Sequence, residues 1–483
     1  MKNILPSWLV KISLDSHSIV GITVGALMYV VCLTGTLLVF SEVWERFEQP
    51  HIPEFNQIES GAYHHALNGF MTRVEKPEKS IYLVLPTEQL PRMHVSDGDH
   101  EWWTDSAGNL LDEPVEGWMQ FVSALHVYLH LPKSFGLIIV SALGAALIAL
   151  IISGILSHPR ILKDAFIFRQ KGNKRIEQAD LHNRLSVWGL PFHIMIAVTG
   201  AFFGLVGLVV VLAAAVFYDG DRTALMDDIY GADPMVNRPV QTVNFENALL
   251  DLSQRSPEAS PIYMVLHDAG TQKQLVEIAA TKPGRLSYSE IYRYHADGTF
   301  INEQGLTSGK ATRQIAYSVY RLHFGWFGGW SVRWLYVMLG MSLTVISVSG
   351  VNIWLHKRGK DDSADRLWVA TVWGFPVGLV AAMAASIFLG GSVALSCLVT
   401  MIFVGAFSVC LRNTEMFRII LKRILSISLV GFSMAYYLVN LSHMVNLIYV
   451  YVCLCLIVVA LCVAANDVIM FLSRVVNGKK TDV

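Results

Sequence analysis

Eight long runs of mostly apolar residues divide this 483-residue chain, and they constrain its fold more than any other feature. A helix needs about 20 apolar residues to cross the hydrocarbon layer of a bilayer, so each run predicts one transmembrane helix. With 53% hydrophobic and only 16% charged residues, the chain has too few charged side chains to cover a soluble core of this size. The runs lie near 18 to 40, 135 to 157, 190 to 217, 332 to 355, 367 to 389, 391 to 411, 420 to 441 and 445 to 472.

Lys and Arg residues gather in the connections on one side of the predicted spans, and this bias sets the expected orientation. The loop from 158 to 190 holds Arg160, Lys163, Arg169, Lys171, Lys174, Arg175 and Arg184. With eight spans, both termini then lie in the cytoplasm, and the two long inserts, about 41 to 131 and 218 to 330, face outward. The first insert has 15 Asp and Glu against 5 Lys and Arg, which disfavours nucleic acid and anionic lipid as its partners.

The first four runs contain an internal repeat. In DSHSIVGITVGALMYVVCLTG and DLHNRLSVWGLPFHIMIAVTG a histidine precedes a Thr-Gly pair by 17 residues, and the second and fourth runs also correspond. The matching positions are His17 with Thr34 and Gly35, His182 with Thr199 and Gly200, His126 with Ser153 and Gly154, and His323 with Ser349 and Gly350. Each half therefore reads span, outward insert, span, and a repeat of this kind relates two halves about an axis along the membrane normal.

The two inserts also resemble each other, and both predict a small α+β module. In the first, HHALNGFMTRV reads as a helix, followed by the strand-like segments IYLVL, MHV and EWWTDSAGNLL. In the second, FENALLDLSQR is the helix, and PIYMVLHDAG, KQLVEIAA and IYRYHADGTFI are the strands. Both modules end in a hairpin signature of aromatic residues, a turn and a glycine.

Histidines are concentrated on the same half of the chain. Eight of the 16 lie at or near the ends of the first four runs, namely His17, His126, His130, His158, His182, His193, His323 and His356. The last four runs have only His443 among them. Because histidine is costly in lipid, this uneven distribution favours a cofactor held between helices over simple packing.

Haem is the cofactor that this pattern predicts, because haem iron takes imidazole as an axial ligand and two helices can supply one ligand each. Repeat symmetry pairs His126 with His323 near the outer surface. Near the inner surface, it leaves two alternatives, His17 with His182 or His158 with His356. Two haems stacked across the bilayer are therefore expected. His130 and His193 are expected to contact the cofactor or to serve as alternative ligands.

Other residues could complete these sites. Seventeen residues of helix span roughly 25 Å, so each Thr-Gly or Ser-Gly pair is expected at the level of a haem. There Gly35, Gly154, Gly200 and Gly350 would let a flat macrocycle lie against the backbone. Arg321 and Arg333 are candidate partners for haem propionates, and Trp326 is a candidate to shield the edge of an outer haem. Small residues for helix packing and an interfacial aromatic belt are the alternative readings.

The six cysteines all lie inside apolar runs, which excludes disulfides in the outward modules. Their spacing gives no thiolate cluster for zinc or iron–sulfur and no C-x-x-C-H for covalent haem. Any haem is therefore held non-covalently.

Together these residues resemble the PepSY-associated transmembrane proteins, iron-regulated inner-membrane proteins of bacteria that include siderophore reductases. The motifs that carry the resemblance span about 1 to 358 and are DSHSIVGITVG, LHVYLH, SGILSHPRILKDAFIFR, DLHNRLSVWGLPFHIMIAVTG, RLHFGWFG and SGVNIWLHKR. The chain departs from the family pattern at Ser18 and Ile19, where a basic and an aromatic residue are common. Its last 125 or so residues add four spans that minimal members lack.

The resemblance implies a mainly α, polytopic membrane protein of the bacterial inner membrane with a duplicated four-helix core that binds two b-type haems. It implies PepSY-like periplasmic modules and haem ligation by His17, His126, His158, His182, His323 and His356. The implied domains are 1–40 (first segment and span), 41–131 (first module), 132–217 (second span, basic loop and third span), 218–330 (second module), 331–358 (fourth span) and 359–483 (four-helix extension).

The leading functional hypothesis is transfer of electrons from the cytoplasmic side to ferric iron, in a siderophore or other ferric chelate, at the periplasmic face. The sequence contains no G-x-G-x-x-G loop, so a separate protein or a quinol is expected to supply the electrons. Besides these partners, only membrane lipid is expected, and no nucleic acid. Two alternatives stay open: a membrane-anchored PepSY binding or regulatory protein without redox activity, and an accessory to ferrous iron transport.

Overall fold

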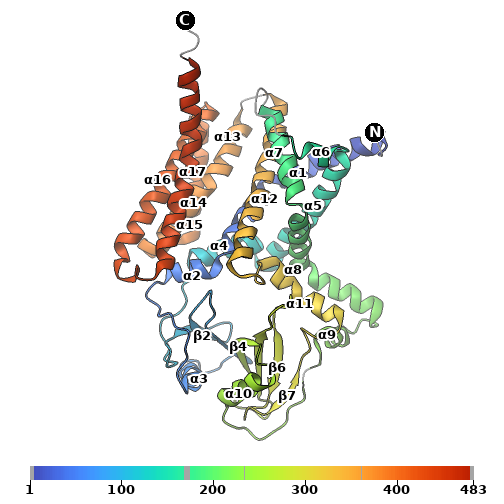
Figure 1. Cartoon of the computed structure of the whole chain (residues 1–483), viewed down its shortest axis with the longest axis vertical. Helices are drawn as coiled ribbons and strands as arrows, with labels where there is room; N and C mark the ends of the chain where they lie inside the picture. Colours follow the sequence, from blue (N-terminus) through green and yellow to red (C-terminus); the bar gives the residue numbers. More distant parts are fainter. Residues whose placement is uncertain (1–4, 168–173, 233, 360–361, 479–483) are drawn as a thin grey trace. The chain divides into compact units, whose positions relative to one another are not determined.

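The computed structural model describes residues 5–167, 174–232, 234–359 and 362–478, with side chains as far as residue 465. Arg169 and Lys171 of the predicted basic loop lie outside these ranges. The chain forms two compact units (Figure 1). The first unit comprises Met1–Pro50, Glu116–Ile194 and Val337–Val483, and the second comprises His51–Val115 and Met195–Tyr336.

Within the described ranges, eight helical spans are long and apolar enough to cross a membrane, which confirms the predicted number. They are α1 (Ser7–Leu38), α5 (Lys133–Ser157), α8 (Leu190–Phe217), α12 (Gly329–Arg358), the run Ser363–Leu389, α15 (Val393–Cys410), α16 (Thr414–Val439) and α17 (Leu447–Gly478). Large apolar side chains on these helices stay uncovered by protein, for example Phe403, which is 71% exposed. Such a surface is suited to contact with lipid.

Several helices begin or end some residues away from the apolar runs, and α1 and α16 are two examples. α1 begins at Ser7, well before the predicted run near residue 18, so His17 lies within a helix and not at its start. α16 begins at Thr414, because the side chain of Asn413 accepts a hydrogen bond of 2.9 Å from the backbone N–H of Met416. Hydropathy marks the part of a helix that lies in lipid, whereas backbone hydrogen bonds and caps decide where the helix ends.

Shorter helices complete the first unit. They are α2 (Ser41–Glu48), α4 (Trp118–Tyr128), α6 (Ile161–Asp164) and α7 (Lys174–Trp188). A turn at Gly189 separates α7 from α8, and Pro191 lies in the first turn of α8, where its missing N–H costs no hydrogen bond. This turn lies between His182 on α7 and His193 on α8.

The run Ser363–Leu389 is not a regular α-helix. It consists of α13 (Ser363–Val369), the π-helical turn η1 (Ala370–Gly374), α14 (Phe375–Ala384) and a second π-helical turn, η2 (Ala385–Leu389). A 3-10 turn, η3 (Leu441–His443), joins α16 to α17. Turns of the π type inside helices occur often where a helix makes a functional contact.

The two predicted α+β segments join in one antiparallel sheet in the second unit. Its strands are β1 (Ser80–Val84), β2 (Met93–Ser96), β3 (Glu101–Thr104), β4 (Ser260–His267), β5 (Leu275–Thr281), β6 (Glu290–Tyr294) and β7 (Phe300–Glu303), in the order β3-β2-β1-β4-β5-β6-β7. The two segments meet where β1 pairs with β4, with Ile81 opposite Leu266 and Leu83 opposite Met264. The predicted strands and helices are confirmed, but their fusion in one sheet was not predicted.

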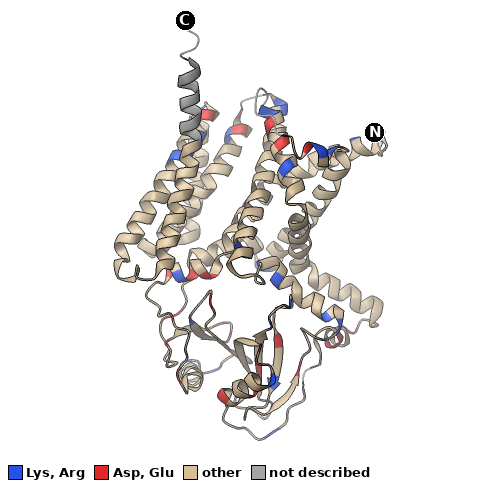
Figure 2. Ribbon diagram, viewed as in Figure 1, with Lys and Arg blue, Asp and Glu red and all other residues tan. Residues whose placement is uncertain are grey.

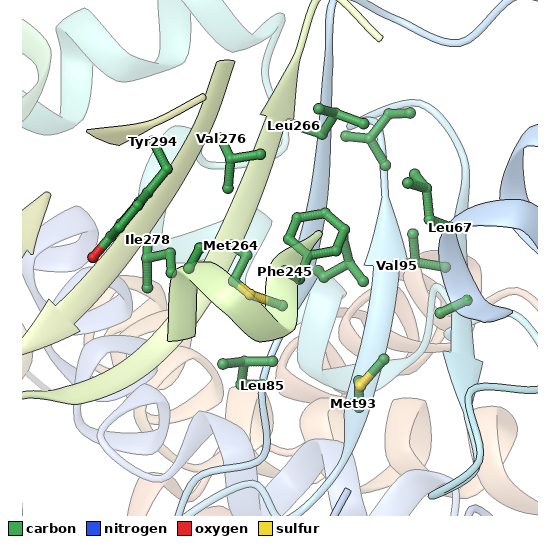
Figure 3. Packing of buried hydrophobic residues seen from close by; sticks show 14 of the residues in the cluster. Leu67, Leu85, Met93, Val95, Phe245, Met264, Leu266, Val276, Ile278 and Tyr294 are labelled. Atoms are coloured by element: carbon green, nitrogen blue, oxygen red, sulfur yellow. The ribbon is translucent and has the colours of Figure 1, made fainter. Parts of the chain in front are cut away.

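One apolar core supports this sheet. Alternate residues of each strand point to one face, where Ile81 and Leu83 are fully buried. The helices α3 (Ala62–Arg73) and α10 (Phe245–Arg255) cover that face, and Phe70 belongs to the same cluster. Figure 3 shows Phe245 of α10 in this cluster. The helices α9 (Arg222–Tyr230) and α11 (Ala311–Phe324) contribute tyrosines to a second cluster with Ala279 and Leu306.

Basic residues cluster at one end of the first unit. Figure 2 shows Lys and Arg of α6, α7 and the last turn of α12 at this end. This clustering agrees with the Lys and Arg bias from which the orientation was predicted.

Candidate functional site

Two predicted ligands meet in the first unit. His17 on α1 and His182 on α7 lie with their ring centres 6.2 Å apart and their planes at 87°. Two imidazoles that bind one metal ion from opposite sides, with metal–nitrogen bonds of about 2 Å, place their ring centres roughly 6 Å apart. The separation therefore matches a metal ion held between the two rings.

The same hydrogen bonds orient both rings. Nδ1 of His17 lies 3.0 Å from the carbonyl oxygen of Leu150 and 3.2 Å from Oγ of Ser153. Nδ1 of His182 lies 3.1 Å from the carbonyl oxygen of Ile346 and 3.1 Å from Oγ of Ser349. Because a carbonyl only accepts, Nδ1 carries the proton in each ring, and the lone pair on Nε2 is left for a metal. Ligating histidines are usually oriented by such a bond.

A cavity of about 1030 Å³ surrounds this pair. Its walls come from α1, α5, α7, α8 and α12 and are mostly apolar, as at Ile22, Leu147 and Leu343. Charged side chains, including Arg175 and Lys357, also line it. Cofactor pockets are commonly 300–1,000 Å³, mainly apolar, with a few polar groups.

The donor set fits haem better than a bare metal ion. Among the described residues, no group of three or more His, Cys, Asp or Glu side chains could hold a metal ion. A zinc site needs three or four protein ligands, whereas haem supplies four nitrogens of its own and needs only axial ligands from the protein. The His17 and His182 pair and the apolar cavity satisfy the second requirement.

Each of the four repeat-related histidines contacts a glycine on a neighbouring helix. A Cβ atom added to Gly154 would lie 3.2 Å from Cε1 of His17, and one added to Gly350 would lie 3.3 Å from Cε1 of His182. The corresponding distances are 2.6 Å between Gly35 and His126 and 3.5 Å between Gly200 and His323. These glycines were expected to make room for a macrocycle, but in the structure they make room for the imidazole of a ligand candidate.

His126 belongs to the first unit and lies on α4. Its Nδ1 donates to the carbonyl oxygen of Val31 at 2.9 Å, one helical turn before Gly35 on α1. Burial lowers the pKa of His126, and the hydrogen bond to Val31 opposes this shift only in part. The ring is therefore neutral near pH 7, as a metal ligand must be.

His323 belongs to the second unit and lies on α11. Its Nδ1 is 2.9 Å from Oγ1 of Thr199, which itself donates to the carbonyl oxygen of Met195. The ring of Phe203 lies against it, with centroids 5.2 Å apart. The pairing of His126 with His323 on one iron stays a prediction.

The two histidines of the other inner alternative have separate surroundings. Nε2 of His158 lies 3.5 Å from a carboxylate oxygen of Asp164, and His356 is exposed on the last turn of α12. Between the two alternatives left open by the repeat, the structure brings together His17 and His182. His158 still lines the cavity.

The two additional histidines have different surroundings. Nε2 of His130 lies 3.2 Å from the carbonyl oxygen of Phe121, in a turn where His130 has φ of 53°. This contact gives the side chain of His130 a hydrogen-bond partner on α4. His193 is buried, lies 3.3 Å from Oγ of Ser342 through its Nε2, and lines the cavity, as expected for a residue that contacts a cofactor.

The predicted outer residues make contacts within the protein. Arg321 donates to the carbonyl oxygens of Arg285 and Ser287, and Trp326 stacks on Phe324 with ring centroids 4.8 Å apart. Arg333 is buried, with its guanidinium 5.9 Å from the ring of Trp330. The pairing of Arg321 and Arg333 with haem propionates stays a prediction.

Sequence reasoning missed Arg175 and Lys357 as cavity residues. Both lie among many Lys and Arg at a membrane edge, where the orientation bias accounts for basic residues without a site. Nothing in the sequence distinguishes Arg175 and Lys357 from the other Lys and Arg residues near them.

The environment of His182 also suits a ligand. Burial, and then the nearby His17, lower the pKa of His182 to about 4. Its ring is therefore neutral at physiological pH, with the Nε2 lone pair available.

Eight apolar spans and one antiparallel sheet define a polytopic membrane protein. Residues 14–357 match the family described as the PepSY-associated TM region, and the chain belongs to this family. The family resemblance found in the sequence motifs is thus confirmed. The uncharacterized protein PA4219 of Pseudomonas aeruginosa is 32% identical to this chain over 279 residues, which cover 54% of this chain and 71% of that protein.

Proposed function

We propose that this membrane protein is a b-type haem oxidoreductase of the bacterial inner membrane that passes electrons from the cytoplasmic side to ferric iron at the periplasmic face. The observation that carries the proposal is the His17 and His182 pair, with ring centres 6.2 Å apart and both Nδ1 atoms hydrogen-bonded to backbone carbonyls. Haem would supply a reversible one-electron couple at this position.

The chain's own residues have separate roles in this proposal. The carbonyls of Leu150 and Ile346 fix the two ligand rings, so that little ordering is needed when the cofactor binds. The mostly apolar walls of the cavity would lower the local dielectric around a bound iron and so tune its potential. Arg175 and Lys357, which line the cavity, would pair with propionates.

The orientation follows from the basic end of the first unit. The cavity that holds His17 and His182 is lined by Arg175 and Lys357 of this end, so we place this site toward the cytoplasm and the electron donor. By repeat symmetry we assign a second haem to His126 and His323, toward the periplasm. A separate protein or a quinol supplies the electrons.

The proposed substrate is ferric iron in a chelate, such as a siderophore. Hard anionic oxygens suit Fe(III) better than Fe(II), so one-electron reduction loosens the complex and releases the metal. This chemistry needs no substrate group to be broken and no protein nucleophile.

An absorption spectrum of the purified protein tests the proposal. We expect a Soret band that shifts and sharpens with dithionite, two haems per chain by the pyridine haemochrome method, and reoxidation when a ferric chelate is added anaerobically. The variant His51→Ala, on an exposed histidine of the second unit, serves as the control and should keep the spectrum. A colourless protein from cells supplied with haem would overturn the proposal.

A further inference from the structure

Two helices hold His126, and both of them contact the C-terminal extension. α4 carries the histidine, and α1 supplies the Val31 carbonyl and the Gly35 surface against which its ring lies. α4 has only 11 residues. Isolated helices shorter than about 12–15 residues are marginal in water, so the position of α4 depends on what holds its ends.

Glu48 caps the first turn of α4 from another helix. Its carboxylate accepts hydrogen bonds from the backbone N–H of Trp118 at 2.5 Å and of Met119 at 2.9 Å. These are two of the N–H groups that a helix start leaves without partners, and an anion is favoured there. Gly117 permits this approach, because a Cβ atom on it would lie 2.2 Å from Oε1 of Glu48.

The C-terminal extension completes this cap. Oγ of Ser386, in η2, donates to Oε1 of Glu48 at 2.8 Å and lies 3.3 Å from the N–H of Trp118. The indole Nε1 of Trp118 donates to the carbonyl oxygen of Leu379, in α14, at 2.9 Å. Trp118 is buried between these groups. The start of α4 is therefore fixed by polar contacts with residues beyond the part of the chain that matches the family, residues 14–357.

Further contacts tie the neighbouring helices to the same extension. The hydroxyl of Tyr436, on α16, donates to the carbonyl oxygen of Phe47 at 2.8 Å, and the two rings stack with centroids 3.7 Å apart. The hydroxyl of Tyr29 donates to the carbonyl oxygen of Val372, in η1, at 2.7 Å. Tyr29 lies two residues before Val31 on α1, so the extension contacts both helices that hold His126.

We propose that the C-terminal four-helix extension positions His126. The positioning residues are Glu48, which caps α4, and Ser386, which donates a hydrogen bond to Glu48 from the extension. This inference rests on the proposed function, in which His126 is a haem ligand. The extension acts through the cap on α4 and sets the orientation of the ring toward the iron. His17 and His182 lie in a different part of the first unit and are held by α5 and α12, so their site does not depend on this cap.

The variants Glu48→Gln and Ser386→Ala test the proposal in the full-length protein. We expect haem at the His126 site to be lost about tenfold more readily, with an altered low-spin electron paramagnetic resonance signal, while the signal of the other haem stays unchanged. Ser392→Ala, which removes the cap of α15 inside the same extension, is the matched control and should change neither signal.

A second measurement reports on the local stability of α4 and needs no bound haem. In protein prepared without haem, hydrogen–deuterium exchange of the α4 segment should accelerate in Glu48→Gln and Ser386→Ala and not in Ser392→Ala. Unchanged exchange and two unchanged haem signals would overturn the inference and leave the proposed function standing. A wild-type protein that binds no haem would overturn both, and equal loss of both haems would show a general loss of folding and overturn the positioning role.

Discussion

At the scale of single residues, a histidine that contacts a glycine recurs four times. Each ring is hydrogen-bonded through Nδ1 and lies over a glycine of another helix, so the orientation of each ring is fixed. A larger side chain at the glycine must displace the ring or the helix. The distance from an added Cβ atom to the histidine ring differs among the four glycines, so substitutions at these positions should have effects of different size.

Gly35→Ala should weaken the His126 site selectively. The added Cβ would lie 2.6 Å from Cε1 of His126, a distance at which the ring must move and its hydrogen bond to Val31 must lengthen. We expect haem affinity at this site to fall by about tenfold or more, measured by haem titration of protein prepared without haem. Gly200→Ala is the matched control, because its Cβ would lie 3.5 Å from His323, an ordinary contact. Equal effects of the two variants would contradict this explanation.

The sequence predicted which residues belong to this motif but not how they contact each other. The constant 17-residue spacing of His17 from Thr34 and of His182 from Thr199 revealed the repeat. Spacing along one helix gives only the level of each residue in the membrane, and the partner across the helix interface depends on packing. For this reason the sequence left His158 and His356 as an equal alternative, and it assigned the glycines to the macrocycle.

At the scale of elements, a network of charged side chains links three neighbouring strands of the sheet, β4, β5 and β6. Glu277 on β5 accepts from Nε of Arg293 on β6 at 2.8 Å, and its other oxygen lies 3.1 Å from Nε2 of His267 on β4. Burial favours the neutral carboxyl, but the hydrogen bonds and positive charges of His267 and Arg293 outweigh it and lower the pKa of Glu277 below its usual 4.5. The ionised form of Glu277 therefore stabilises the folded sheet.

This shift predicts a pH dependence for Glu277→Gln. A carboxyl with a depressed folded pKa contributes stability above its unfolded pKa, and that contribution is lost as the pH falls through the folded value. At pH 7 we expect the variant to be less stable by about 3 kcal/mol, because Arg293 keeps a buried charge without its partner. The difference in Tm between variant and wild type should shrink below about pH 4.5. Glu303→Gln, on exposed β7, is the control, and a difference independent of pH would contradict the assignment.

Strands and helices of the second unit could be predicted, but their joining could not. The short runs IYLVL and PIYMVLH identify β1 and β4, because β-branched and aromatic residues favour strands. The pairing of Ile81 with Leu266 joins segments that are distant in the chain, and local patterns contain no information about such a partner.

At the scale of the whole molecule, each half of the duplication contributes one histidine to the His17 and His182 pair. If His17 and His182 bind the same iron, then His17→Ala, His182→Ala and the double variant should each lose one haem of two, and the double variant should lose no more than either single variant. Haem per chain by pyridine haemochrome measures this. If each single variant lost one haem and the double variant lost both, the two residues would bind different irons.

In the proposed function, the orientation of the chain decides which site would meet the donor, and it is testable with single cysteines. All six native cysteines lie in membrane spans, so a membrane-impermeant maleimide should give little background in the parent protein. Asp99→Cys, in the exposed turn between β2 and β3, should be labelled in intact spheroplasts. Lys163→Cys, exposed on α6, should be labelled only after the membrane is opened. The reverse pattern would place the His17 and His182 site on the periplasmic side and make it the site of chelate reduction, because the basic end of the first unit would then face outward.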